Sequence, residues 1–183
     1  MDTETNNFKN ILLVEDDPQD VALTLAALDE YHLANRVFVV NDGEDALDYL
    51  YCQGKFKIRT RGDPIVVLLD LKMPKVNGLE VLKAIKADED LKSIPVVMLS
   101  SSRETPDLVE CYKHGVNAYV VKPVDFAEFM KAVKLLGIFW AAVNEPPPNT
   151  GREETPVQPG ETIFPGKKEE GNEILAPHSA FGR

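Results

Sequence analysis

Short apolar runs alternate with stretches of helical periodicity between residues 9 and 143. The runs with few polar positions lie at residues 11–14, 36–40, 65–69, 94–99 and 118–121. Short continuous apolar runs are typical of strands that are buried on both faces of a sheet. Strands of this kind occur mainly in parallel sheets that have helices packed on both sides.

Apolar side chains between these runs recur every three or four residues, as they do along one face of a helix. The pattern predicts helices after Pro18, from about 44 to 52, around 79–86, over 104–114 and from about 125 to 143. Five strands that alternate with five helices predict an α/β fold, a doubly wound sheet of five parallel strands.

The last 40 residues, 144–183, differ in composition from the rest of the chain. They hold seven of the 13 prolines and five of the 11 glycines, with few apolar residues. A segment of this composition cannot bury enough apolar surface to fold, so we expect a disordered tail. The chain is thus expected to comprise an N-terminal extension (1–8), one domain (9–143) and this tail.

Charge and cysteine content exclude several classes of function. The chain of 183 residues has 30 acidic and 20 basic side chains, a net charge of −10. An acidic protein repels nucleic acid and anionic lipid, so neither is an expected partner. We expect no transmembrane helix or signal peptide, because no run of 18 apolar residues occurs and the N-terminus is polar. Two distant cysteines without a CxxC motif fit a reducing cytoplasm.

Residues that can carry chemistry follow four of the predicted strands. They are Glu15, Asp16 and Asp17 after the first, Asp70 and Lys72 after the third, Ser100 after the fourth and Lys122 after the fifth. In open α/β sheets, ligands bind outside the carboxyl ends of the strands. These side chains are therefore expected to meet at one rim of the sheet.

The residue types at this rim suit phosphoryl transfer. Clustered carboxylates favour a divalent cation, and an all-oxygen ligand set suits Mg²⁺. The carboxylate of Asp70 could act as a nucleophile and form an aspartyl phosphate, whose oxygens Mg²⁺, Lys122 and Ser100 would neutralise. Alternatively, acids after strands cap the next helix, and Asp17 before Pro18 fits that interpretation well. Capping explains neither Asp70 nor Lys122.

Four motifs in this order resemble the receiver domain of two-component response regulators. They are Leu13-Val14-Glu15-Asp16-Asp17, then Leu68-Leu69-Asp70-Leu71-Lys72-Met73-Pro74 with Gly78, then Pro95-Val96-Val97-Met98-Leu99-Ser100, then Tyr119-Val120-Val121-Lys122-Pro123. The resemblance covers residues 9–143. It implies a flavodoxin-like (βα)5 fold with the strand order 2-1-3-4-5.

The resemblance also assigns roles in phosphorylation. Asp70 would accept a phosphoryl group from a sensor histidine kinase, and Lys122 would pair with the phosphate. Ser100 would be the switch hydroxyl, and Tyr119 the aromatic whose rotamer follows it. The peptide bond between Lys122 and Pro123 would be cis, which is affordable before proline.

The metal site that the resemblance implies holds Mg²⁺. Its ligands would be Asp16, Asp70 and the main-chain carbonyl of Lys72, and Glu15 would act nearby through water. The chain departs from the common family pattern at two positions. Glu15 stands where an Asp is common, and Ser101 stands where Ala is frequent; both replacements are expected to be tolerated.

The resemblance implies a stand-alone response regulator without a DNA-binding output domain. Such a protein is not an enzyme for external substrates; it catalyses its own phosphotransfer and autodephosphorylation. A Mg²⁺-dependent phosphohydrolase is an alternative, but it usually needs a second Asp two residues after the nucleophile, where this chain has Lys72. A binding scaffold that does not use phosphate is a third possibility, and the complete acidic, hydroxyl and lysine set argues against it.

A narrower resemblance concerns the kinase partner. The long connection 53–64, the pair Phe139-Trp140 and the segment 144–148 are similar to those of small receivers that partner phytochrome-type histidine kinases. Basic residues at alternate positions of that connection, Lys55, Lys57, Arg59 and Arg61, could dock an acidic kinase surface. A solvated loop is the alternative that we favour.

The last predicted helix is apolar on more than one face. One stripe suits the sheet and consists of Phe129, Val133, Leu136 and Trp140. Further apolar residues fall outside it: Leu135, Ile138, Phe139 and Ala142. Exposed apolar surface often marks a partner site, so we expect a homodimer or kinase contact here, unless the tail folds back over it.

Overall fold

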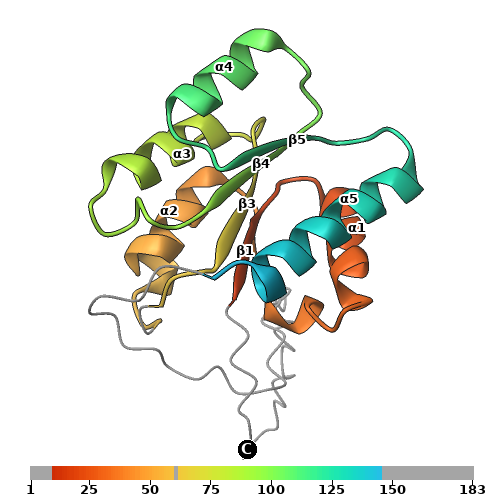
Figure 1. Cartoon of the computed structure of the whole chain (residues 1–183). Helices are drawn as coiled ribbons and strands as arrows, with labels where there is room; N and C mark the ends of the chain where they lie inside the picture. The colour runs from red at the N-terminus through yellow and green to blue at the C-terminus, as the bar shows by residue number, and fades with distance from the viewer. Residues whose placement is uncertain (1–9, 60–61, 146–183) are drawn as a thin grey trace, which may run out of the picture.

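The fold is a parallel five-stranded sheet with helices on both faces (Figure 1). The computed structural model describes residues 10–59 and 62–145. The strands are β1 (Ile11–Val14), β2 (Val37–Val40), β3 (Val66–Asp70), β4 (Val96–Ser100) and β5 (Ala118–Val121), in the order β2-β1-β3-β4-β5. Val14 of β1 lies opposite Val40 of β2 and Leu69 of β3. The predicted doubly wound sheet and its strand order are confirmed.

Two helical layers bury the two faces of this sheet. The helices are α1 (Pro18–Asp29), α2 (Gly43–Tyr51), α3 (Gly78–Ala87), α4 (Thr105–Lys113) and α5 (Phe126–Ile138). Figure 1 shows α1 and α5 together on one side of the sheet, with α2, α3 and α4 on the other. Leu12 and Val14 face the layer of α2 to α4, and Ile11 and Leu13 face α1 and α5. This alternation is why each strand reads as continuously apolar.

Polar residues at the helix ends follow ordinary capping chemistry. The Asp17 carboxylate accepts a hydrogen bond from the N–H of Gln19 at 2.7 Å and caps α1, as predicted. Asn77 and Glu80 form a reciprocal capping box at the start of α3. After α4, Gly115 adopts a φ of +83°, which glycine tolerates best. Short 3-10 turns, Ala34–Arg36 and Gly54–Phe56, fill two connections.

The last helix changes character before its predicted end. Regular α-helix stops at Ile138, and a π-helical segment, Phe139–Val143, continues it. The N–H of Asn144 donates to the carbonyl of Phe139 at 2.7 Å, five residues back, which defines the wider turn. Trp140 is buried as predicted, and Phe139 lies edge-on against it but is half-exposed.

One cysteine belongs to the core. Cys111 on α4 is fully buried within the cluster that joins β4 to α3 and α4, and no disulfide involves it. The predicted N-terminal extension and all but the first two residues of the predicted tail lie outside the described residues. None of the helices in the described part is long and apolar enough to cross a bilayer.

Candidate functional site

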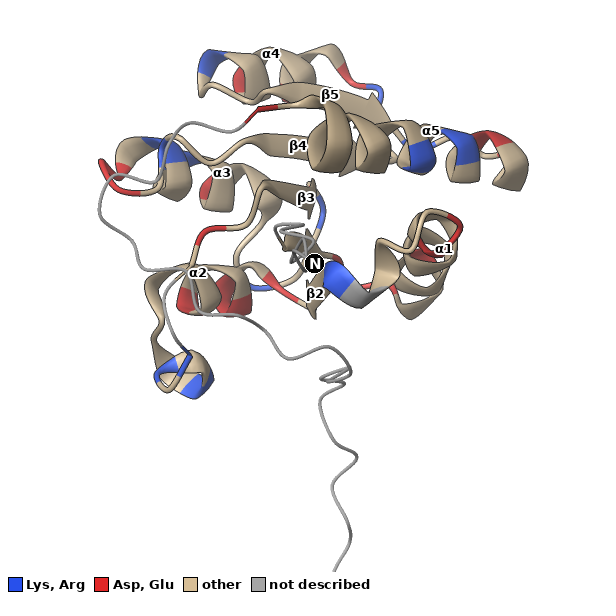
Figure 2. Ribbon diagram, turned by 60° about the horizontal axis from the view of Figure 1, so that its bottom comes forward, with Lys and Arg blue, Asp and Glu red and all other residues tan. Residues whose placement is uncertain are grey.

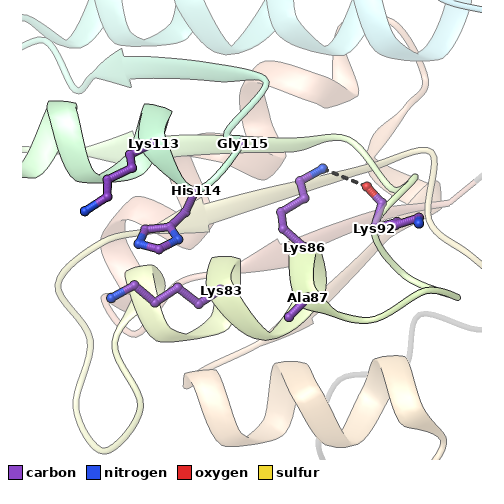
Figure 3. Close-up of a pocket in the computed structure, with 7 residues that line it drawn as sticks. All are labelled: Lys83, Lys86, Ala87, Lys92, Lys113, His114 and Gly115. Carbon is purple, nitrogen blue, oxygen red and sulfur yellow. Dashed lines mark hydrogen bonds between the residues drawn. The ribbon is translucent and has the colours of Figure 1, made fainter.

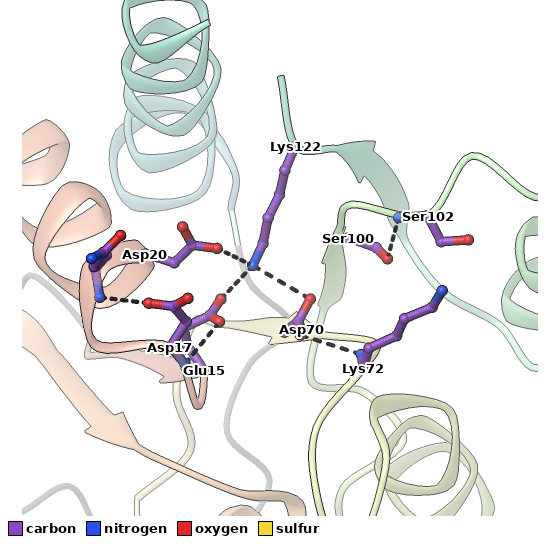
Figure 4. A network of polar contacts seen from close by, with 9 residues as sticks. Glu15, Asp17, Asp20, Asp70, Lys72, Ser100, Ser102 and Lys122 are labelled. Carbon is purple, nitrogen blue, oxygen red and sulfur yellow. Dashed lines mark hydrogen bonds and ion pairs between the residues drawn. The ribbon is translucent and has the colours of Figure 1, made fainter. Parts of the chain in front are cut away.

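The predicted chemical residues meet at the carboxyl ends of the strands. Asp70 ends β3, Ser100 ends β4, and Lys122 follows β5 directly, while Glu15 follows β1 (Figure 4). Glu15 is 2% exposed, Asp70 7% and Ser100 0%. Asp16, next to Glu15, is exposed. The site therefore combines buried groups beneath with one exposed carboxylate at its mouth.

A lysine ammonium lies at the centre of the acidic residues. Lys122 Nζ is 2.7 Å from a carboxylate oxygen of Glu15, 2.7 Å from one of Asp20 and 3.4 Å from one of Asp70. The sequence analysis did not single out Asp20. Its position in the first turn of α1 reads as an acid that complements the helix dipole. Its place four residues after Asp16, at the start of the helix that follows β1, was the signal that could have pointed to the rim.

Burial and mutual contact shift the protonation of this group of residues. Burial raises the pKa of Glu15 to about 7, although its hydrogen bond to Lys122 acts in the opposite direction. Burial also raises the pKa of Asp70, against the attraction of Lys122. Burial by itself would lower the pKa of Lys122, but hydrogen bonds to Asp20 and Glu15 outweigh it and the pKa is raised. Lys122 therefore stays charged.

The acidic residues fit a magnesium site. Glu15, Asp16 and Asp70 each offer a carboxylate oxygen, and these oxygens lie within 4.8 Å of one another. Three carboxylate oxygens, of which that of Asp16 lies at the exposed mouth, suit a hard cation that keeps several waters. The main-chain N–H of Lys72 donates to Asp70 at 3.2 Å, so the loop after β3 already encloses the carboxylate. The predicted use of the Lys72 carbonyl as a ligand stays a prediction.

Gly78 lets the backbone beneath Asp70 close tightly. A Cβ atom at this position would lie 2.1 Å from the carbonyl oxygen of Asp70. The N–H of Gly78 donates to the carbonyl of Leu71 at 3.0 Å. The start of α3 is thus held directly against the peptide of Asp70, and no other residue would fit there without displacing it.

The predicted switch residues lie on the neighbouring strands. The Ser100 hydroxyl accepts a hydrogen bond from the N–H of Ser102 at 3.1 Å. The Tyr119 hydroxyl donates to the carbonyl of Ser102 at 3.2 Å, and its ring packs against the core. Both residues therefore contact the loop that joins β4 to α4.

One expectation for the loop after β5 is wrong. The peptide bond between Lys122 and Pro123 is trans, and no cis peptide occurs in residues 10–59 and 62–145. A bond that precedes proline prefers trans by only about 0.5–1 kcal/mol, so the sequence alone does not fix its isomer.

A hollow near the amino ends of the strands, away from the residues described above, is not part of this site. It has a volume of about 540 Å³ and lies between the carboxyl ends of α3 and α4 (Figure 3). Lys86 lines it and donates to the carbonyls of Lys92 and Ile94, at 3.1 and 2.8 Å, and to Asn117 Oδ1 at 3.1 Å. Burial lowers the pKa of Lys86. Cations at helix carboxyl ends also complement the dipoles there, which explains the basic character of the hollow.

The connection after α2 is held mainly by local contacts. Figure 2 shows the acidic face of α2 beside the basic turn that follows it. Lys55 pairs with Asp45, and the Arg59 guanidinium lies 3.8 Å from the ring centre of Tyr49. These contacts give two of the alternating cations a structural use, and Arg61 lies outside the described residues.

A family model for the response regulator receiver domain matches residues 11–134. The chain belongs to the response regulator receiver family. Response regulator Rcp1 of Synechocystis is 37% identical over 140 residues, which covers 76% of this chain and 94% of Rcp1. Receivers of this family are phosphoacceptor switches rather than enzymes that turn over external substrates.

Solved structures of receiver proteins share this fold. The phosphorylated cyanobacterial phytochrome response regulator RcpA is 38% identical, with a TM-score of 0.72, over 76% of this chain and 99% of RcpA. The Mn²⁺-bound form of Rcp1 is 36% identical, with a TM-score of 0.71, over the same shares of 76% and 99%. The bacteriophytochrome response regulator AtBRR is 58% identical, with a TM-score of 0.61, over 76% and 99%.

Proposed function

We propose that this receiver is a phosphorylation switch in which Asp70 accepts a phosphoryl group from a sensor histidine kinase in a Mg²⁺-dependent reaction. The observation that carries the proposal is the placing of Asp70 between an ammonium and an acidic cluster. Lys122 lies 3.4 Å from Asp70 on one side, and carboxylate oxygens of Glu15 and Asp16 lie within 4.8 Å on the other. A phosphoryl group on Asp70 would thus be met by positive charge from two directions once the cation is bound.

The chemistry is a phosphoryl transfer to a carboxylate. An oxygen of Asp70 attacks phosphorus, a new P–O bond forms, and the P–N bond of the phosphohistidine breaks. The electron pair of that bond goes to the histidine nitrogen, which takes up a proton. In dephosphorylation, a water oxygen attacks phosphorus and the acyl phosphate P–O bond breaks, which restores the Asp70 carboxylate. The two water protons leave with inorganic phosphate and solvent.

Each remaining residue has one part in this reaction. Asp16 and Asp70 would hold Mg²⁺ with the Lys72 carbonyl, and Glu15 would act nearby. Mg²⁺ supplies charge neutralisation of phosphoryl oxygens when it is bound. The Lys122 ammonium would bind a second phosphoryl oxygen.

The output of the switch would be a change of surface. The Ser100 hydroxyl would donate to a phosphoryl oxygen, and Tyr119 would follow the shift of the loop that both contact. Apolar residues are exposed on α4 next to this loop, among them Val109 and Tyr112. A surface of this kind can be offered to or withdrawn from a partner protein, without an output domain.

We further propose a phytochrome-like kinase as partner and a homodimer through the last helix. The first part rests on the phytochrome response regulators among the similar proteins. The second rests on Leu135 and Phe139, which are 62% and 47% exposed, and on Val143 beyond them. Sedimentation of the full chain is expected to show a dimer that Leu135→Glu dissociates. A concentration-independent monomer would contradict the dimer.

The decisive test of the switch is intact mass after incubation with Mg²⁺ and acetyl phosphate. We expect one addition of about 80 Da that hydroxylamine removes, as an acyl phosphate requires. Asp70→Asn is the matched control, because it keeps the size of the side chain and removes the nucleophile. No addition to the wild-type protein, with Mg²⁺ binding confirmed, would favour the scaffold alternative. Rapid hydrolysis of unrelated phosphate esters would favour the phosphohydrolase instead.

A further inference from the structure

We propose that Asp107, acting through Ser102, is a positioning residue for the Ser100 hydroxyl; this rests on the proposed phosphorylation of Asp70. Asp107 lies in the first turn of α4, where its carboxylate contacts Ser102. Its effect would pass through the loop between β4 and α4, which the Ser102 side chain fastens to the helix.

The fastening consists of two hydrogen bonds at the Ser102 hydroxyl. Ser102 Oγ donates its proton to an Asp107 carboxylate oxygen at 2.6 Å and accepts the N–H of Glu104 at 3.3 Å. The Ser102 side chain is buried, with the residue 5% exposed. A short bond from a buried hydroxyl to a carboxylate is stronger than a neutral hydrogen bond. The Ser102 hydroxyl therefore has a single orientation.

The main chain of Ser102 forms a hydrogen bond with each of the two predicted switch residues, Ser100 and Tyr119. The Ser102 N–H donates to Ser100 Oγ at 3.1 Å, and the Ser102 carbonyl accepts from the Tyr119 hydroxyl at 3.2 Å. One residue thus engages β4, β5 and α4 with its N–H, its carbonyl and its side chain. A displacement of Ser102 would alter all three contacts together.

The bond to Ser100 has a direct chemical consequence. A hydroxyl offers one donor and two acceptor sites. The Ser102 N–H occupies an acceptor site of Ser100 Oγ and so limits how the hydroxyl can turn, and its one proton can pass from the neighbouring Tyr119 hydroxyl to a phosphoryl oxygen. This arrangement prepares the donor before the phosphoryl group arrives, which is how positioned hydrogen bonds speed a reaction.

A capping role for Asp107 would be the ordinary alternative. An acid in the first turn of a helix complements its dipole whatever it contacts. The same helix supplies the control, because Glu104 is the N-cap residue of α4 and its side chain makes no capping bond within the described part of the chain. Glu104→Ala removes a carboxylate at the same helix end and leaves the Ser102 hydroxyl bonded to Asp107.

The experiment measures the rate at which acetyl phosphate phosphorylates the full chain with Mg²⁺, by intact mass, for wild type, Asp107→Ala, Ser102→Ala and the double variant. We expect each single variant to be slower by about fivefold and the double variant to be no slower than either, because the residues act through one bond. Asp107→Asn keeps an acceptor for the Ser102 proton and should recover most of the rate. Glu104→Ala should match the wild type.

Amide hydrogen exchange at Ser102 gives a readout that needs no phosphate. Exchange of this N–H should accelerate in Asp107→Ala but not in Glu104→Ala, at equal thermal stability. Equal rates and equal exchange in the two variants would overturn the proposal. So would effects of Asp107→Ala and Ser102→Ala that multiply in the double variant. A wild-type chain that gains no phosphate would overturn the proposed function, whereas normal phosphorylation with no effect of Asp107→Ala overturns this inference alone.

Discussion

Two lysines at opposite ends of the strands, Lys122 at the carboxyl ends and Lys86 at the amino ends, each place their ammonium beside three oxygens. Lys122 faces the carboxylates of Glu15, Asp20 and Asp70. Lys86 faces two backbone carbonyls and the side-chain oxygen of Asn117. Their pKa values move in opposite directions: burial lowers that of Lys86, whereas its carboxylate partners raise that of Lys122.

The two lysines differ in their surroundings: Lys86 holds parts of the backbone together, whereas Lys122 lies in the candidate functional site. The Lys86 ammonium donates to three neutral oxygens of the protein, so no additional ligand is needed to satisfy its hydrogen bonds. Around Lys122, three carboxylates share one ammonium, and the negative charge that remains is the feature that would attract a divalent metal. Burial is common to both sites; the charge of the partners distinguishes them.

The largest expected effect concerns phosphorylation. Lys122→Met should slow phosphorylation by acetyl phosphate by about 100-fold, the loss typical of a charge-stabilising group at a transition state. Lys86→Met should change the rate per folded molecule by less than about twofold, because its ammonium lies at the other ends of the strands. Both rates are measured by intact mass. Similar losses in the two variants would remove the distinction between these lysines.

The stability of the fold should show the reverse order of importance. Lys86→Met removes the ammonium donor of the Lys92 and Ile94 carbonyls, while Asn117 Oδ1 keeps the N–H of Val96, and it should lower the free energy of unfolding by about 1 kcal/mol in urea titrations. Lys92→Met is the matched control, since the Lys92 ammonium is exposed and pairs with Glu89 on the surface. That variant should stay within about 0.5 kcal/mol of the wild type. A Lys86→Met protein as stable as the wild type would show that water satisfies the Lys92 and Ile94 carbonyls.

The acidic edge should make stability depend on pH. Burial raises the pKa of Glu15 from 4.5 to about 7 in the folded protein, so the folded state keeps a proton that the unfolded chain has lost. The stabilisation that protonated Glu15 contributes is therefore fully present below the unfolded pKa of 4.5. It is lost as the pH rises through the folded pKa of about 7. Without divalent ions, the free energy of unfolding of the wild type relative to Glu15→Gln should fall by about 2 kcal/mol from about pH 5 to about pH 8. A difference between the two proteins that is the same at pH 5 and pH 8 would contradict the raised pKa of Glu15.

The smallest expected effect concerns Asp20. Asp20→Asn removes one competitor for the Lys122 ammonium and one negative charge that repels an anionic phosphodonor. Phosphorylation should become faster by about twofold, as expected for a partly exposed charge. A slower reaction would show instead that Asp20 holds Lys122 in its working position.

The sequence predicts the sheet well because buried parallel strands are apolar on both faces. It also predicts the site residues that follow strands, since parallel strand ends share one edge. Asp20 was missed because it lies within a helix, where an acid in the first turn has an ordinary explanation. Lys86 falls within the helix predicted around 79–86, and only the structure shows the three oxygens around its ammonium.

Two further differences arise from energies too small for a pattern to reveal. The last helix was predicted as continuous to residue 143, yet its end is π-helical from Phe139. Both forms place Trp140 in the core, so the apolar spacing is the same for each. The isomer of the bond before Pro123 is likewise undecided by residue type. In both cases tertiary contacts, which a sequence pattern does not contain, choose between near-equal alternatives.

The burial of Cys111 gives the molecule a built-in reporter of helix motion. Its thiol is sealed beneath α4, and burial raises its pKa, so a thiol-modifying reagent reacts with it only when the helix swings away from the sheet. The rate of thiol modification therefore reports how often α4 opens, without an attached dye. In a Cys52→Ser variant, the rate of Cys111 modification can be compared before and after phosphorylation. The comparison would show whether phosphorylation changes the mean position of α4 or the frequency with which it opens.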